Sequence, residues 1–152
     1  MAPASGFRWT GDTSTLSSYR SSERGHREFC RVCGSVAPIL DPSAGLAIVP
    51  AGNLEGDLGL RPTRHMFVAS KANWYTIADD LPQYDEFPPE FGMPATPREP
   101  VAVRPGVTQG SCLCGDVSYE ISGEPLRMYY CHCSRCRQGR SAAHCSNVFY
   151  KA

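Results

Sequence analysis

The sequence predicts a mainly β fold assembled around metal sites, and three observations lead to this prediction. Apolar and polar residues alternate with the period of a β-strand in several short segments. The chain contains 14 glycines and 13 prolines, residue types that interrupt helices. Most of its eight cysteines stand one or two residues apart, a spacing typical of thiolate ligands to a single metal ion.

The size and charge of the chain exclude several classes of protein. Its 152 residues suffice for one sizeable core but not for two ordinary domains. Lys plus Arg is 15 and Asp plus Glu is 15, and this balance argues against nucleic-acid or membrane partners held by a basic field. No segment approaches the roughly 20 apolar residues of a membrane span, and the N-terminal residues lack a secretory signal pattern. We therefore expect a cytoplasmic protein.

The chain divides into two blocks that flank a proline-rich segment. Residues 1–87 form the first block, residues 88–109 the linker and residues 110–152 the second block. The linker holds six of the 13 prolines, which favour an extended, semi-rigid conformation. Neither block has enough strand-like segments to form a comfortable fold alone, so we expect the two to fold together.

Individual elements follow from local patterns. In the first block, residues 46–49 and 66–68 are short apolar runs that predict buried strands. Residues 77–81 are the best candidate for a brief helical turn, which Pro82 would end. In the second block, residues 116–121 alternate as a half-buried strand does. Residues 123–125 predict a turn, and alternation resumes over residues 126–130.

Seven of the eight cysteines fall into three tight groups. Disulfide frameworks usually spread their cysteines along the chain, whereas thiols this close together suit metal ligation in a reducing compartment. The groups contain two, two and three cysteines, namely Cys30 and Cys33, Cys112 and Cys114, and Cys131, Cys133 and Cys136. The eighth, Cys145, stands apart.

Ligand counting predicts one closed and one open zinc site. Structural zinc takes four protein ligands, while catalytic zinc commonly takes three and keeps one position open. The simplest partition joins the first two groups into a four-thiolate site and leaves the third group as a three-thiolate site. Two alternatives stay open: Cys133 and Cys136 could join the first pair, or Cys145, His132 or His144 could close the three-cysteine site.

Longer motifs resemble the glutathione-dependent formaldehyde-activating enzyme family. They are Gly110-Ser-Cys-Leu-Cys-Gly-Asp-Val-Ser-Tyr-Glu120 and Cys131-His-Cys-Ser-Arg-Cys-Arg-Gln-Gly139. The first block resembles the C-terminal half of the same family in Phe29-Cys-Arg-Val-Cys-Gly-Ser35, His65-Met-Phe-Val-Ala-Ser-Lys-Ala72 and Asp79-Asp-Leu-Pro-Gln83.

The resemblance implies a β-tent fold of small antiparallel sheets around two zinc ions. Matched position by position, four cysteines correspond to the family's structural set and three to its catalytic set. The structural set is Cys30, Cys33, Cys112 and Cys114, and the catalytic set is Cys131, Cys133 and Cys136.

The order of the halves departs from the family, in which the segment like 110–152 comes first. The chain could be a circular permutant, a homodimer that exchanges halves, or a piece cut from a tandem of two domains. We favour one permuted domain within a single chain, because both halves are nearly complete and neither would fold well alone.

The resemblance also implies a reaction between glutathione and formaldehyde, which would make the chain a carbon–sulfur lyase with small thiol and aldehyde substrates. Arg135, Arg137 and Arg140 flank the three-cysteine group, and a guanidinium suits the carboxylates of glutathione. Arg135 and Arg137 are the candidate glutathione contacts. The alternatives are an enzyme for another thiol and a non-enzymatic zinc module that binds a partner. An open three-cysteine site favours the enzyme, and closure by Cys145 would favour the module.

Overall fold

The computed structural model describes residues 2–23, 25–94 and 104–151, so part of the predicted linker, residues 95–103, lies outside them. The chain forms two units. The first combines Met1–Glu55 with Val103–Ala152, and the second is Gly56–Ala102. Among the described residues, no helix is both long and apolar enough to cross a membrane.

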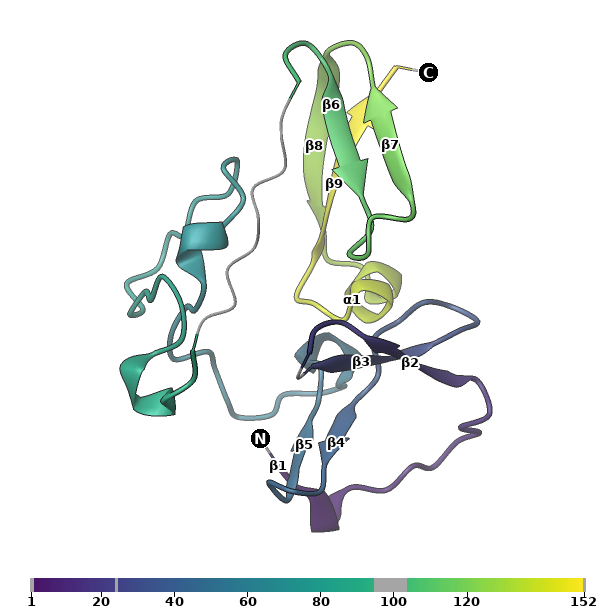
Figure 1. Cartoon of the computed structure of the whole chain (residues 1–152), viewed down its shortest axis with the longest axis vertical. Helices are drawn as coiled ribbons and strands as arrows, with labels where there is room; N and C mark the ends of the chain where they lie inside the picture. Colours follow the sequence, from purple (N-terminus) through teal and green to yellow (C-terminus); the bar gives the residue numbers. More distant parts are fainter. Residues whose placement is uncertain (1, 24, 95–103, 152) are drawn as a thin grey trace. The chain divides into compact units, whose positions relative to one another are not determined.

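The first unit consists of small antiparallel sheets, as Figure 1 shows. One sheet has the strand order β1–β5–β4, and the other strands pair as the hairpins β2–β3, β6–β7 and β8–β9. The strand bounds in the N-terminal segment are β1 Ala2–Pro3, β2 Leu16–Arg20, β3 His26–Cys30, β4 Ile39–Asp41 and β5 Leu46–Ile48. Those in the C-terminal segment are β6 Thr108–Ser111, β7 Ser118–Ile121, β8 Pro125–Cys131 and β9 Cys145–Tyr150. The prediction of a mainly β fold is confirmed.

Three of the predicted strands are present. The apolar run at 46–49 forms β5, and the alternating segments at 116–121 and 126–130 form β7 and β8. The predicted turn between β7 and β8 contains Gly123 at φ 101°, a conformation that glycine adopts without steric cost. The predicted half-burial of residues 116–121 is wrong, because Val117, just before β7, and Tyr119, within it, are 66% and 56% exposed.

Helix α1 (Ser134–Arg140) was not predicted from the sequence. Its N-cap is Cys133, whose Sγ accepts a hydrogen bond from the backbone N–H of Cys136 at 3.4 Å. A cysteine sulfur therefore takes the place that the side-chain oxygen of Ser, Thr, Asp or Asn usually fills. Ser141 ends the helix in the left-handed region at φ 54°. The N-terminal end carries no standard capping residue, and only the basic residues Arg137 and Arg140 in the last turn match a sequence rule for helix ends.

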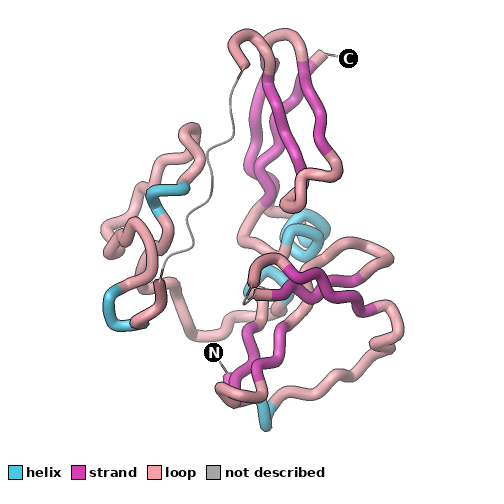
Figure 2. Tube along the Cα trace, in the orientation of Figure 1, coloured by secondary structure: helices cyan, strands magenta, loops and turns pink. Residues whose placement is uncertain are grey.

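The second unit is mostly loop, as Figure 2 shows, with two short 3-10 helices, η3 (Val68–Ser70) and η4 (Pro89–Phe91). The prediction of a strand at 66–68 is wrong. Phe67 has φ 60°, which no strand residue adopts, and its ring packs edge-on against Phe87 at 4.6 Å. Only an isolated parallel bridge between His65 and Gln83 remains.

The predicted helical turn at 77–81 is also wrong, because the carboxylate of Asp79 binds a backbone N–H that a helix would use. Its Oδ1 accepts the N–H of Leu81 at 3.0 Å and lies 2.9 Å from Nε2 of His65. A short acidic side chain that captures a nearby backbone donor replaces the helical hydrogen bond with a local bend.

Few side chains of the described residues are buried. Ala47 and Cys145 are the buried apolar side chains, at 1% and 7% exposure, and Pro88 is also buried. Gly52, in the 3-10 helix η2 (Ala51–Asn53), is the buried backbone position of the first unit that matters most for the site described next.

Candidate metal centre

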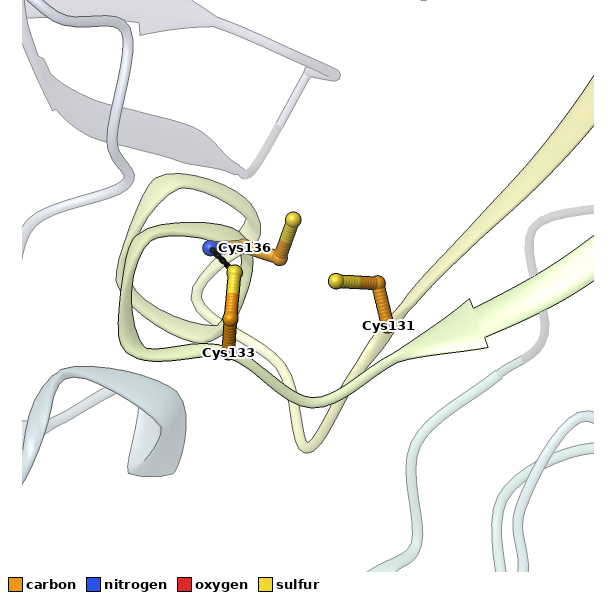
Figure 3. A group of neighbouring side chains, drawn as sticks. All are labelled: Cys131, Cys133 and Cys136. Atoms are coloured by element: carbon orange, nitrogen blue, oxygen red, sulfur yellow. Dashed lines mark hydrogen bonds between the residues drawn. The ribbon is translucent and has the colours of Figure 1, made fainter.

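Three cysteine sulfurs converge where β8 ends and α1 begins. Cys131 is the last residue of β8, Cys133 caps α1 and Cys136 lies in its first turn. The three Sγ atoms all lie within 4.8 Å of one another. Figure 3 shows the sulfurs of Cys131 and Cys136 turned toward the space between the strand and the helix. Among the described residues this is the one group of three or more Cys, His, Asp or Glu side chains that could hold a metal ion.

Without a cation among them, the three thiols resist losing all their protons. Hydrogen bonds with Cys131 and Cys133, together with burial and their negative charge, raise the pKa of Cys136 to about 12. The backbone N–H of Cys136 lowers the pKa of Cys133. Three thiolates this close together repel one another unless a positive ion lies among them. The donor set is soft and contains no carboxylate, which suits zinc and other thiophilic metals.

The remaining predicted ligands form two separate pairs. The Sγ atoms of Cys112 and Cys114 lie 3.3 Å apart. In the other pair, the backbone N–H groups of Cys33 and Val32 lower the pKa of Cys30 to about 7. The structure does not bring the two pairs into one group, among the residues it describes. The four-thiolate site therefore stays a prediction.

Cys145 lies beside the three-cysteine group without joining it. It is the residue directly opposite Cys131 in the β8–β9 ladder. Its Sγ instead donates to Oδ1 of Asn147 at 3.2 Å. Neither His132 nor His144 is a member of the group, and their rings contact each other in a tilted arrangement with centroids 5.0 Å apart. Within the described residues, the cluster thus has three protein donors.

A pocket of about 430 Å³ opens beside the cluster, and Cys136 belongs to both. The pocket is lined by Cys33, Gly34, Arg135, Cys136, Gly139, Arg140, Cys145 and Asn147. Within the described part of the chain, no acceptor binds the guanidinium of Arg135 or of Arg140. The pocket therefore combines a thiol cluster with two positive charges that are available to an anion.

Arg137 differs from its two neighbours, because its guanidinium binds within the chain. It donates to the carbonyl oxygens of Gly52 and Leu54 at 2.6 and 2.7 Å and to both carboxylate oxygens of Glu55 at 2.9 and 3.0 Å. It does not line the pocket. The glutathione contact predicted for Arg137 stays a prediction, and the pocket is lined by Arg135 and Arg140.

Sequence reasoning singled out Arg140 but did not assign it a role. The role of Arg140 could not be inferred because helix α1 was not predicted from the sequence. Residues four apart share a face of a helix, so Arg140 lies on the face of Cys136, and Arg137 is rotated away from it. Asn147 and Glu55 carry no local pattern that could have identified them.

Comparisons with known proteins agree with the location of this site. Residues 107–152 match the family profile described as glutathione-dependent formaldehyde-activating enzyme. This segment contains β6 to β9, α1 and the three clustered cysteines. No curated protein and no solved structure matches the chain.

Proposed function

We propose that this chain, whose residues 107–152 belong to the glutathione-dependent formaldehyde-activating enzyme family, is a zinc-dependent carbon–sulfur lyase. Its reaction would join glutathione and formaldehyde into S-hydroxymethylglutathione, or release them from it. The observation that carries this proposal is that Cys136 belongs both to the three-cysteine cluster and to a pocket with two arginines that bind no acceptor among the described residues.

Cys131, Cys133 and Cys136 would hold the zinc ion. When bound, zinc would supply a site at which an incoming thiol loses its proton at neutral pH. With three protein donors in the described cluster, one position of a tetrahedral ion is left for the substrate. Supporting this division of roles, the sulfur of Cys145 is hydrogen-bonded to Asn147 instead of closing the group.

Arg135 and Arg140 would bind the carboxylates of glutathione. Both line the pocket, and a guanidinium fork pairs with a carboxylate through two parallel hydrogen bonds. A pocket of about 430 Å³ is in the size range of small-molecule sites. Anchoring the carboxylates would place the thiol sulfur toward Cys136, so positioning would contribute to the rate together with thiol activation.

The chemistry is an addition that balances without any oxidant. The thiol sulfur forms a bond to the carbonyl carbon of formaldehyde, and the carbon–oxygen π bond opens. The proton lost by the thiol ends on the former carbonyl oxygen. In reverse, the hydroxyl loses its proton, the carbon–sulfur bond breaks and the thiol is regenerated.

A zinc-replete exchange assay tests the proposal. NMR with carbon-13 formaldehyde would measure interconversion of formaldehyde and its glutathione adduct above the spontaneous rate. We expect acceleration by the wild-type protein and return to the spontaneous rate in Cys133→Ser, because one zinc ligand is lost. Metal-depleted wild-type protein, reloaded with zinc, separates loss of metal from loss of fold.

The outcomes distinguish the alternatives. Zinc-loaded wild-type protein without acceleration of any thiol in a panel would overturn the enzyme proposal and favour a zinc module. Acceleration with another thiol but not with glutathione would overturn only the substrate.

A further inference from the structure

We propose that Arg137 is a positioning residue: it holds α1 against residues 52–55 and so sets the distance of Cys136 from the other two sulfurs. This inference rests on the metal site of the proposed function but not on the reaction. It gives Arg137 a structural role, whereas the sequence alone suggested its guanidinium as a glutathione contact.

The guanidinium of Arg137 binds three acceptor groups, all of them in residues 52–55. One terminal nitrogen donates to the carbonyls of Gly52 and Leu54, and the other forms a two-point pair with the carboxylate of Glu55. Gln138 donates to the same carboxylate at 2.7 Å. The Arg137 side chain is 23% exposed and that of Glu55 is 70% exposed, so water screens the ion pair more than it screens the part-buried bonds to the two carbonyls.

The backbone of Arg137 connects these side-chain hydrogen bonds to the cysteine cluster. Its N–H donates to the carbonyl of Cys133 at 2.9 Å, and its carbonyl accepts the N–H of Ala142 at 3.2 Å. It also directly follows Cys136 in the chain. Any rotation of α1 that breaks the side-chain bonds therefore moves two of the three sulfur-bearing residues.

A second contact leaves α1 little freedom to shift. A Cβ added to Gly52 would lie 2.3 Å from the backbone nitrogen of Ala142, so the chain segments meet at backbone distance. The hydroxyl of Ser141 and the amide of Asn53 both donate to the carbonyl of Val36, at 3.1 and 2.6 Å. Thus the end of α1 and the loop that carries Glu55 share an anchor.

The geometry of the cluster depends on the contacts that hold α1, because its three sulfurs come from different elements. Cys131 belongs to β8, whereas Cys133 and Cys136 move with α1, and only His132 separates the two parts. Hydrogen bonds from α1 to Gly52, Leu54 and Glu55 connect the helix directly to this loop. A metal ion needs its donors placed to within a few tenths of an ångström.

Metal affinity of the full chain tests the proposal without reference to activity. Zinc affinity would be measured by chelator competition, and cobalt(II) absorption would report thiolate geometry, with Cys133→Ser identifying the signal of this cluster. We expect Arg137→Lys to weaken zinc binding at the cluster about tenfold or more and to shift its cobalt spectrum. Lysine keeps the charge but cannot bind three acceptor groups in a fixed fork.

A matched control and a second variant separate positioning from folding. Arg61→Lys alters another two-point arginine–carboxylate pair, with Asp57, and should leave the cluster unchanged. If Arg137→Lys does not fold, Glu55→Gln tests the proposal instead. We expect it to weaken zinc binding at the cluster as well, but by less. Unchanged zinc affinity and an unchanged cobalt spectrum in a folded variant would overturn the proposal. If the reaction fails but the affinity falls, only the proposed function is wrong.

Discussion

Arg135, Arg137 and Arg140 lie within one seven-residue helix, and the helix separates their chemistry. Arg135 and Arg140 line the pocket, whereas the guanidinium of Arg137 donates hydrogen bonds to backbone carbonyls and to the carboxylate of Glu55. Identical side chains therefore serve different purposes according to the face on which they stand. The pKa of Glu55 is lowered by its hydrogen bond with Arg137, which keeps that carboxylate ionised.

Replacing Arg140 with glutamine should impair binding of glutathione specifically. The lost charged hydrogen bonds are worth roughly 1.5–3 kcal/mol, so we expect the KM for glutathione to rise about tenfold or more. The KM for 2-mercaptoethanol, which has no carboxylate, should not change. Steady-state kinetics with both thiols measure the difference. Arg127→Gln is the control, because that guanidinium lies over the rings of Tyr129 and Phe149. An equal change for both thiols would contradict the assignment.

At the scale of elements, short connections decide what can be placed accurately. The path from β8 into α1 is so short that the three cysteines lie close together along the chain, and the long-range bonds of Arg137 then hold α1 in place. The second unit shows the opposite case. Its loops are held by individual polar contacts, such as those of Asp57, which accepts the N–H of Gly59 at 2.9 Å and pairs with Arg61.

The Asp57–Arg61 pair gives this loop a defined pH dependence. The hydrogen bond with Arg61 lowers the pKa of Asp57 to about 2 from an ordinary 3.8. Because the folded pKa is the lower one, the stabilisation is complete above the ordinary value and is lost as the pH falls toward 2. NMR titration of the Asp57 carboxyl should give a midpoint near 2. In Arg61→Ala the midpoint should rise toward its ordinary value, and an unmoved midpoint would contradict the pairing.

At the scale of the whole molecule, burial is too slight to be the main source of stability. The described residues bury only a few side chains, and the sheets have two or three strands each. A fold that buries so few side chains gains stability from bound metal ions, because binding of a structural metal is itself folding free energy. We therefore propose that two zinc ions stabilise a permuted domain in which residues 1–87 complete the family segment.

Native mass spectrometry tests this arrangement directly. We expect a single chain that carries two zinc ions and that loses cooperative unfolding when a chelator removes them. The matched sample is chelator-treated protein reloaded with zinc. A dimer with four ions would overturn the permuted monomer and favour exchange of halves. One ion per chain would overturn the four-thiolate site.

The sequence alone determined the features that depend on neighbouring residues. Strand β5 follows from a short apolar run, strands β7 and β8 follow from local alternation, and the cluster of Cys131, Cys133 and Cys136 follows from its spacing. Strand periodicity and ligand spacing are short-range properties, so no tertiary contact is needed to recognise them.

Only the tertiary structure decided which groups meet across the chain. Arg137 and its partners at 52–55 are separated by more than 80 residues, and the pocket joins Cys33 to α1. The same holds for Phe67, whose left-handed backbone and contact with Phe87 overrule an apolar run that predicts a strand. Long-range hydrogen bonds and packing choose among conformations that local preference leaves close in energy, and no local pattern encodes that choice.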